Sequence, residues 1–269
     1  MEKGAWIIGD VHGCYATLLA LLDKLPKEDK KIFVGDLIDR GPQSRKVIQL
    51  IKDNNYDCVL GNHEEMMIDA YDDYDDPSQA AGWFGNGGNF TYWNYDKFTE
   101  FEEDVEFLKS LPVHLVYEDI VDKEGRKLLV THSAALNVIN HRISSEEKLK
   151  IENNKHNIIH YQDTMENTKN IILWNRKKPS EIDKNDYFNV FGHTPMQHFA
   201  LREDYSIRLS DEVFYEKKIA LDRDIGYANI DTGAIYSKLA GKYNNKLTAL
   251  HYPSFKLVQQ QNIDTEKKG

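Results

Sequence analysis

The chain has 269 residues, of which 41% are hydrophobic and 29% are charged. This composition is too apolar for a disordered protein, and the length is enough for one large α/β domain or two small ones. Lysine and arginine number 34 against 44 aspartates and glutamates, which gives a formal net charge of −10. Because so acidic a surface repels phosphate backbones, we expect no general nucleic-acid binding.

Cysteine content and hydropathy indicate the compartment. Two cysteines, Cys14 and Cys58, are too few for a disulfide framework and favour the cytoplasm. The N-terminal stretch has no long apolar segment and soon reaches an acidic residue, so it predicts no secretory signal. No apolar run approaches the ~20 residues that cross a bilayer, so we expect no membrane partner.

Strand and helix patterns alternate over the first sixty residues. Apolar runs at 5–9, 31–35 and 57–60 predict strands, and leucine or isoleucine spacing predicts helices over 18–25 and 44–52. This alternation favours a sheet with parallel pairs and right-handed crossovers, in an α/β or α+β fold. Ligands of such sheets bind at the carboxyl ends of the strands.

The remaining elements are predicted with less regularity. A polar stretch over 144–170 is expected to be mainly helical, and the acidic run 71–76 to be a helix end or a loop. We see no linker, so residues 1–258 are expected to form one domain, and the polar tail 259–269 to fray. The other expected elements are a helix over 100–111 and strands over 113–117, 127–131, 188–191, 228–230, 235–239 and 247–252.

Potential metal ligands follow the ends of apolar runs. The segments are Gly9-Asp10-Val11-His12-Gly13, Gly35-Asp36-Leu37-Ile38-Asp39-Arg40-Gly41, Gly61-Asn62-His63-Glu64, Thr131-His132 and Gly192-His193-Thr194. Aspartate, asparagine and histidine converging at one sheet edge suit Mn²⁺, Fe or Zn²⁺ better than Ca²⁺. With no cysteine among them, a structural zinc site is disfavoured. The alternative interpretation is turn residues that cap helices, and buried core histidines.

Taken together, these segments resemble the phosphoprotein phosphatase family of serine/threonine phosphatases, within the wider calcineurin-like metallophosphoesterases. The resemblance covers nearly the whole chain and extends to Asn86-Gly87-Gly88 with Thr91, and to Trp174-Asn175-Arg176. The segment Asn229-Ile230-Asp231-Thr232-Gly233-Ala234, followed by 246–250, looks like the bacterial and bacteriophage branch. The expected fold is a two-sheet β-sandwich core flanked by helices, with the metal site at the strand ends.

The resemblance implies two divalent metal ions, expected to be Mn²⁺, with Fe or Zn²⁺ as alternatives. Two such ions can share one hydroxide that attacks phosphorus directly, without a phosphoenzyme. The residues that match the family's ligands are Asp10 and His12 for one ion, Asp36 as the bridge, and Asn62, His132 and His193 for the other.

Four further residues match catalytic positions of the family. His63 corresponds to the histidine that protonates the leaving oxygen, and Asp39 to its carboxylate partner. Arg40 corresponds to the arginine that holds the phosphate. Arg176 matches a second phosphate arginine more loosely, and a surface salt bridge is its alternative.

Hydrolysis of phosphomonoesters, above all on phosphoserine or phosphothreonine proteins, is therefore the expected function. A symmetrical diadenosine tetraphosphatase or another nucleotide hydrolase is the alternative, although Gly192-His193-Thr194-Pro195 looks more like the phosphatases. A catalytically dead binding module is the third possibility, and the oligomeric state stays open. The expected partners are a phosphorylated protein or a small phosphoester.

Three other features leave alternatives open. The aromatic residues of 83–95 either stack a nucleobase beside the pocket or pack under a long loop. Ser133 departs from the small glycines that often follow the family's histidine, so its hydroxyl is expected to lie near the site and to narrow it. Asp231 either supports a ligand histidine or forms a simple turn.

Overall fold

A computed structural model describes residues 4–136, 168–177, 186–195, 219–235 and 246–264. These residues form two five-stranded sheets. The strands are β1 (Ala5–Ile8), β2 (Lys30–Phe33), β3 (Asp57–Cys58), β4 (His114–Val121), β5 (Lys127–Thr131), β6 (Tyr187–Phe191), β7 (Ala220–Asp222), β8 (Tyr227–Asn229), β9 (Lys246–Tyr252) and β10 (Lys256–Gln261). The order is β10-β9-β1-β2-β3 in one sheet and β4-β5-β6-β8-β7 in the other.

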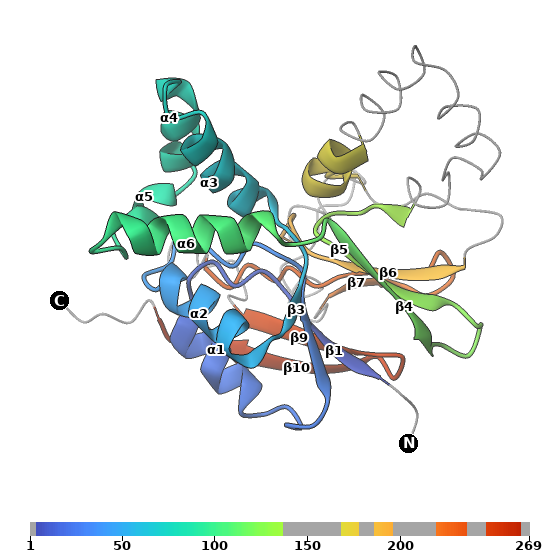
Figure 1. The fold of residues 1–269 in the computed structure, drawn as a ribbon. Helices are drawn as coiled ribbons and strands as arrows, with labels where there is room; N and C mark the ends of the chain where they lie inside the picture. The colour runs from blue at the N-terminus through green and yellow to red at the C-terminus, as the bar shows by residue number, and fades with distance from the viewer. Residues whose placement is uncertain (1–3, 137–167, 178–185, 196–218, 236–245, 265–269) are drawn as a thin grey trace, which may run out of the picture.

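The main apolar layer lies between the two sheets. Alternate residues of β1 and β2 point into it, because successive side chains of a strand face opposite sides of the sheet. They meet the buried apolar residues of β5, β6 and β8, which include Leu128, Val130, Phe188, Val190 and Ala228. The expected two-sheet core flanked by helices is confirmed (Figure 1).

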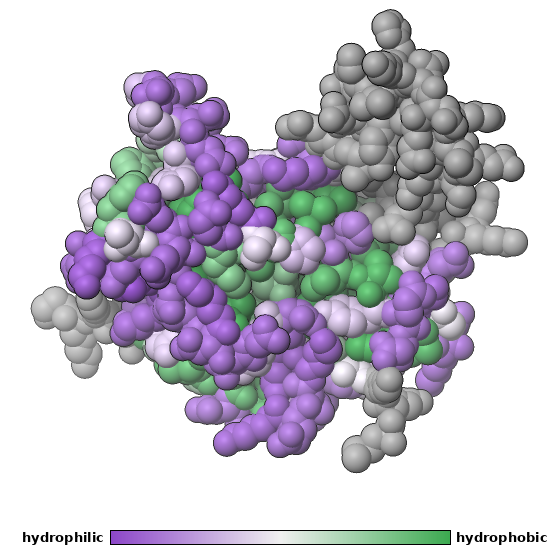
Figure 2. Space-filling model, viewed as in Figure 1, coloured by the Kyte–Doolittle hydropathy of each residue, from purple (hydrophilic) through white to green (hydrophobic). Residues whose placement is uncertain are grey.

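Helices cover the outer face of the first sheet and the top of the molecule as drawn in Figure 1. They are α1 (Tyr15–Leu22), α2 (Ser44–Asn54), α3 (Asn62–Asp72), α4 (Pro77–Gly85), α5 (Gly88–Tyr92) and α6 (Phe98–Lys109). Trp6, Ile8 and Phe33 point away from the other sheet and pack with the apolar faces of α1 and α2. Figure 2 shows mostly hydrophilic residues over the helices, with hydrophobic ones near α5 and where β4 and β5 run. None of the helices described here is long and apolar enough to span a membrane.

Several elements differ from the sequence expectation. Helices α3, α4 and α5 were not expected, and neither were β7 and β10. The strand expected over 235–239 falls outside the described residues from 236 onward. The same holds for most of the stretch 144–170, of which residues 168–170 begin a helical turn that runs to 174.

The expectation of a frayed tail is wrong for residues 259–264. Gln259 to Gln261 pair with β9 as part of β10. Asp264 then accepts hydrogen bonds from the backbone N–H groups of Ala16 and Thr17, at 2.9 and 2.8 Å. Because Cys14 at the start of α1 makes no side-chain cap, Asp264 supplies the acceptor that the first turn of this helix lacks.

Replacing Asp264 should therefore destabilise the fold. We expect Asp264→Ala to lower the free energy of unfolding by about 0.5–2 kcal/mol, the usual cost of a lost cap. Asp264→Asn keeps an acceptor oxygen and should cost less. Urea denaturation of both variants measures the difference, and wild-type stability in Asp264→Ala would show that the tail does not hold α1.

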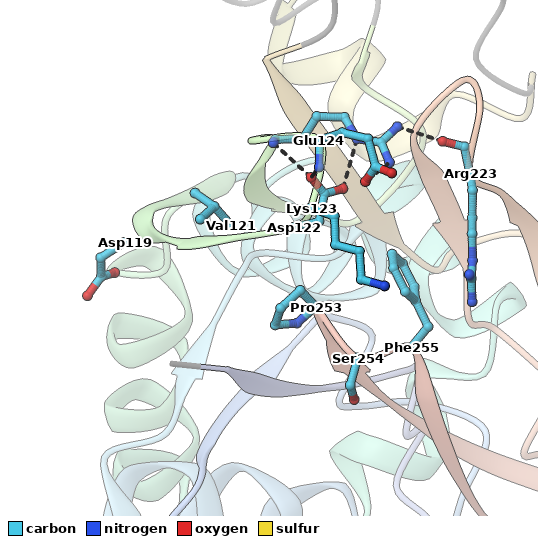
Figure 3. Close-up of a pocket in the computed structure, with 10 residues that line it drawn as sticks. Asp119, Val121, Asp122, Lys123, Glu124, Arg223, Pro253, Ser254 and Phe255 are labelled. Atoms are coloured by element: carbon cyan, nitrogen blue, oxygen red, sulfur yellow. Dashed lines mark hydrogen bonds and ion pairs between the residues drawn. The ribbon is translucent and has the colours of Figure 1, made fainter. Parts of the chain in front are cut away.

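A cavity of about 530 Å³ lies at the end of the sandwich where strands β1, β5 and β8 begin (Figure 3). Three turns line it, at 122–126, at Arg223 and at 253–255. Arg126 also lines it, and its Nε donates to Asp122 at 2.8 Å and its Nη1 to the Arg223 carbonyl at 2.6 Å. Because β1, β5 and β8 run away from it, this cavity is remote from the strand ends that carry the expected ligands.

Candidate metal and phosphate site

The carboxyl ends of β1, β2, β5 and β6 meet at one edge of the sandwich. The His193 N–H, just after β6, donates to the Asp10 carboxylate after β1 at 3.0 Å. A Cβ at Gly192 would lie 1.9 Å from Asp10 Oδ1, so only glycine allows this approach. The His132 ring, after β5, contacts the Val34 carbonyl after β2 at 2.8 Å. The four strand ends thus bring side chains from distant parts of the chain together.

Several candidate site residues have unusual backbone conformations. Five residues at the site have positive φ angles, which only a few per cent of non-glycine residues adopt. They are His12 (47°), Asp36 (49°), Asp39 (71°), Arg40 (67°) and His193 (69°).

Glu64 holds the loop that carries Asp36. Its buried carboxylate accepts the backbone N–H groups of Asp36 and Leu37, each at 2.8 Å, and of Gly61 at 2.9 Å. These donors come from the ends of β2 and β3, so one side chain ties both loops together. Such over-determined contacts are what allow a strained backbone to persist.

Two groups of candidate ligands share Asp36. One consists of His12, Asp36 and His63 and the other of Asp36, His132 and His193, and the ligand atoms within each group lie within 4.8 Å of one another. Asn62 adjoins the second group, because its Oδ1 lies 2.8 Å from His132 Nε2 and 2.9 Å from His193 Nδ1. Six residues expected as ligands therefore lie together: Asp10, His12, Asp36, Asn62, His132 and His193, all of them buried.

The tautomers of two histidines leave lone pairs that face carboxylate oxygens. Nδ1 of His12 donates to the Ile38 carbonyl at 2.9 Å and Nδ1 of His132 to Val34, so each Nε2 of the neutral ring carries a lone pair. These Nε2 atoms lie 3.5 and 3.3 Å from the oxygens of Asp36. Burial lowers the pKa of both imidazoles, which opposes a proton there. The Arg40 guanidinium already donates to His12 Nε2 at 2.7 Å, whereas His132 Nε2 faces the oxygens of both Asp36 and Asn62. A cation there would relieve the repulsion between these electron pairs, so the donor set around His132 fits a metal ion.

Two more observations support the same fit. Burial raises the pKa of Asp231 to about 7 and that of Asp10 well above its usual value, and the charge of Asp36 adds to both. A bound cation would stabilise these crowded carboxylates. Among the residues the structure describes, buried His193 Nε2 has no hydrogen-bond partner. Histidine nitrogens and carboxylate oxygens are the ligand types that Mn²⁺, Fe and Zn²⁺ accept.

His63 and Arg40 lie beside the first group. Nδ1 of His63 donates to Asp39 Oδ2 at 2.6 Å, which directs Nε2 toward the site. The Arg40 guanidinium lies 2.7 Å from both His63 Nε2 and His12 Nε2. The backbone N–H of Arg40 donates to the Gly87 carbonyl at 3.2 Å. A forked cation next to a histidine–aspartate pair is suited to hold a phosphate near a proton donor.

Arg176, Ser133 and Asp231 are the residues whose roles the sequence left open. Exposed Arg176 reaches Thr194 Oγ1 at 3.5 Å, one residue after His193. The hydroxyl of Ser133 donates to the Ile172 carbonyl at 2.7 Å and accepts the Asn175 N–H, so it binds the neighbouring helix and does not narrow the site. Asp231 Oδ1 accepts the Gly233 N–H at 2.9 Å, as in a turn.

A family model described as calcineurin-like phosphoesterase matches residues 5–221. The chain belongs to the calcineurin-like phosphoesterase family. Members of this family use a dinuclear metal centre. The donor set described above offers candidate ligands for such a centre at the strand ends.

Individual relatives include phosphatases and nucleotide hydrolases. Serine/threonine-protein phosphatase 2 of Salmonella typhimurium is 36% identical over 141 residues, 49% of this chain and 59% of that protein. The symmetrical bis(5'-nucleosyl)-tetraphosphatase of Erwinia tasmaniensis is 39% identical over 71 residues, 24% of this chain and 26% of that protein. The chain thus spans little more than half the length of the phosphatase, and less of the tetraphosphatase.

The fold is similar to that of solved phosphatases. A protein serine/threonine phosphatase from Saccharomyces cerevisiae superimposes with a TM-score of 0.52 at 13% identity, over 99% of this chain and 82% of that one. This likeness concerns the fold of the calcineurin-like phosphoesterase and not its substrate.

The sequence did not predict the contacts that three residues make at the site. Glu64 stood in a quoted motif, but its contacts with the loop of Asp36 are not visible in the chain order. Trp83 and Thr91 both donate to Asp39, from helices that were not expected. The sequence signals for them were the aromatic stretch 83–95 and the family motif Asn86-Gly87-Gly88 with Thr91, which do not show that either side chain contacts Asp39.

Proposed function

We propose that this chain hydrolyses phosphomonoesters with two divalent metal ions, and that its substrates are phosphoserine and phosphothreonine residues of proteins. The observation that carries the proposal is the Asp36 carboxylate shared by two ligand groups, next to Arg40 and the His63–Asp39 pair. A carboxylate within reach of both groups suits two ions that lie close together, the arrangement that two-metal phosphatases use.

In this proposal six residues hold the metals. Asp36 serves both ions, and the other ligands are Asp10 and His12 on one side and Asn62, His132 and His193 on the other. Mn²⁺ is the proposed ion, with Fe or Zn²⁺ as alternatives. When bound, the two ions supply positive charge to the phosphoryl oxygens and make water a better nucleophile at neutral pH.

The side chains around the metals bind the phosphate and move a proton. Arg40 provides parallel N–H donors for two phosphate oxygens, and Arg176 adds a second positive charge from the rim. His63 donates a proton from Nε2 to the leaving serine or threonine oxygen, while Asp39 fixes its Nδ1–H. Without this proton the leaving group would be an alkoxide, which departs slowly.

Hydrolysis of a dinucleoside polyphosphate is the second candidate, because symmetrical tetraphosphatases match 71 residues of the chain. Two observations favour the phosphomonoester. The matched segment is 141 residues long for serine/threonine-protein phosphatase 2 and 71 for the tetraphosphatase, and Gly192-His193-Thr194-Pro195 resembles the motif of the phosphatases.

A turnover panel tests the proposal. The Mn²⁺-loaded protein is assayed on a phosphoserine peptide, on p-nitrophenyl phosphate and on diadenosine tetraphosphate, with a chelated sample as control. We expect kcat/KM to be higher for the phosphopeptide than for the dinucleotide, and no turnover after chelation. The reverse ranking would support the tetraphosphatase, and inactivity on all three would support a binding module.

A further inference from the structure

The Asp39 carboxylate has more partners than His63. Trp83 Nε1 lies 3.1 Å from both of its oxygens, and Thr91 Oγ1 donates to Oδ1 at 2.7 Å. His63 Nδ1 donates to Oδ2, so side chains from α3, α4 and α5 converge on one fully buried carboxylate. Such a group can change neither rotamer nor partner without leaving a buried donor unsatisfied.

Thr91 also fixes the backbone of Asp39. The Asp39 N–H donates to Thr91 Oγ1 at 2.8 Å and to Ser44 Oγ at 3.1 Å. Thr91 therefore contacts both the main chain and the carboxylate of a residue whose φ is +71°. These contacts stabilise a conformation that an L-residue rarely adopts.

The segment between Trp83 and Thr91 is built for this close approach. A Cβ at Gly88 would lie 2.4 Å from the Trp83 indole, so glycine lets α5 pack against the ring. Gly87, with φ of 103°, presents its carbonyl to the Arg40 N–H. Trp83 is 3% exposed and Trp93 is 70% exposed, so the two tryptophans of the segment have different surroundings.

We infer that Trp83 and Thr91 are positioning residues that hold Asp39, and through it His63, in the orientation needed for proton donation to the leaving group. The inference rests on the proposed function. It gives a role to residues 83–91, for which the family motif implies none. Neither residue is a catalytic residue, because each acts only through Asp39.

Kinetics of matched variants test the inference. Trp83→Phe keeps an aromatic ring and removes the indole N–H. Thr91→Val keeps the shape and removes the hydroxyl, whereas Thr91→Ser keeps the hydroxyl. Trp93→Phe makes the same ring exchange at an exposed position and serves as the control. All are assayed with Mn²⁺ on a phosphoserine peptide and on p-nitrophenyl phosphate.

On the phosphopeptide, we expect Trp83→Phe and Thr91→Val to lower kcat by about 10–100-fold, as for other partners that orient site residues. KM should stay close to the wild-type value. The loss should be smaller on the aryl phosphate, whose leaving group needs little protonation. Thr91→Ser should have most of the wild-type kcat, and Trp93→Phe should equal the wild type. In the His63→Asn background, Trp83→Phe should cause no further loss of kcat.

A spectroscopic readout separates this inference from the proposed function. In the Zn²⁺-loaded protein, the short bond from His63 to Asp39 should give a low-field ¹H resonance that disappears in His63→Asn. We expect Trp83→Phe and Thr91→Val, but not Trp93→Phe, to shift or broaden it. If the wild type hydrolyses no phosphomonoester, the proposed function fails while this resonance still tests the positioning.

Two results would overturn the inference. One is an unchanged low-field resonance in both Trp83→Phe and Thr91→Val. The other is an equal loss of kcat on both substrates, which would indicate a general structural role. Because Thr91→Val removes only one hydroxyl, it keeps the test decisive if Trp83→Phe folds poorly.

Discussion

Asp36→Asn is expected to lose both metal ions and most activity, with a larger effect than any other single change of a ligand. Asp36 is the only residue common to the two compact ligand groups. Its oxygens face His12 on one side and His132 on the other. Removing the charge weakens both sites at once and leaves the cations poorly neutralised. Turnover should fall by at least ~10²-fold, since the metals supply several kcal/mol of transition-state stabilisation.

Metal content by elemental analysis and turnover should fall together in this variant. Asparagine has nearly the shape of aspartate, so the loop should still fold, which circular dichroism checks. Asp75→Asn changes an exposed carboxylate and is the matched control. Two ions bound with wild-type affinity in Asp36→Asn would contradict a bridging role.

His63→Asn is expected to separate chemistry from metal binding. His63 follows Asn62 in α3, and its ring is held by Asp39. Asparagine cannot donate a full proton, so kcat should fall by ~10²–10⁴, the range for losing a general acid. Metal content should stay near the wild-type value, because His63 is proposed as an acid and not as a ligand.

Leaving groups of different quality sharpen this second test. The loss should be largest with phosphoserine, whose alkoxide needs the proton, and smallest with p-nitrophenyl phosphate. An equal loss on both would indicate that His63 instead stabilises charge. Because His63 Nε2 lies 4.0 Å from Asp36 within one ligand group, loss of metal would indicate a ligand role and would also question Asn62.

Local patterns predict the part of the site that lies at strand ends. Asp10, Asp36 and Asn62 each follow an apolar run and a glycine, and parallel strands bring their carboxyl ends to one edge. The sequence therefore predicts the strand ends on which the candidate ligands lie, although their distances depend on loops with positive φ.

Local sequence patterns do not predict contacts between residues that are far apart in the chain. Asp39 and Trp83 are 44 positions apart, and their contact depends on how α4 docks. Asp264 caps α1 from 248 positions away, while its polar neighbours in β10 show no strong alternation. Tertiary pairing overrides weak local preference in both places.

Metal titration tests the central claim most directly. The metal-free protein is titrated with Mn²⁺ while bound metal and turnover of a phosphoserine peptide are measured on the same samples. The account predicts that turnover is absent without metal and reaches its maximum at two ions per chain. Full turnover in a sample that elemental analysis shows to be free of metal would contradict it.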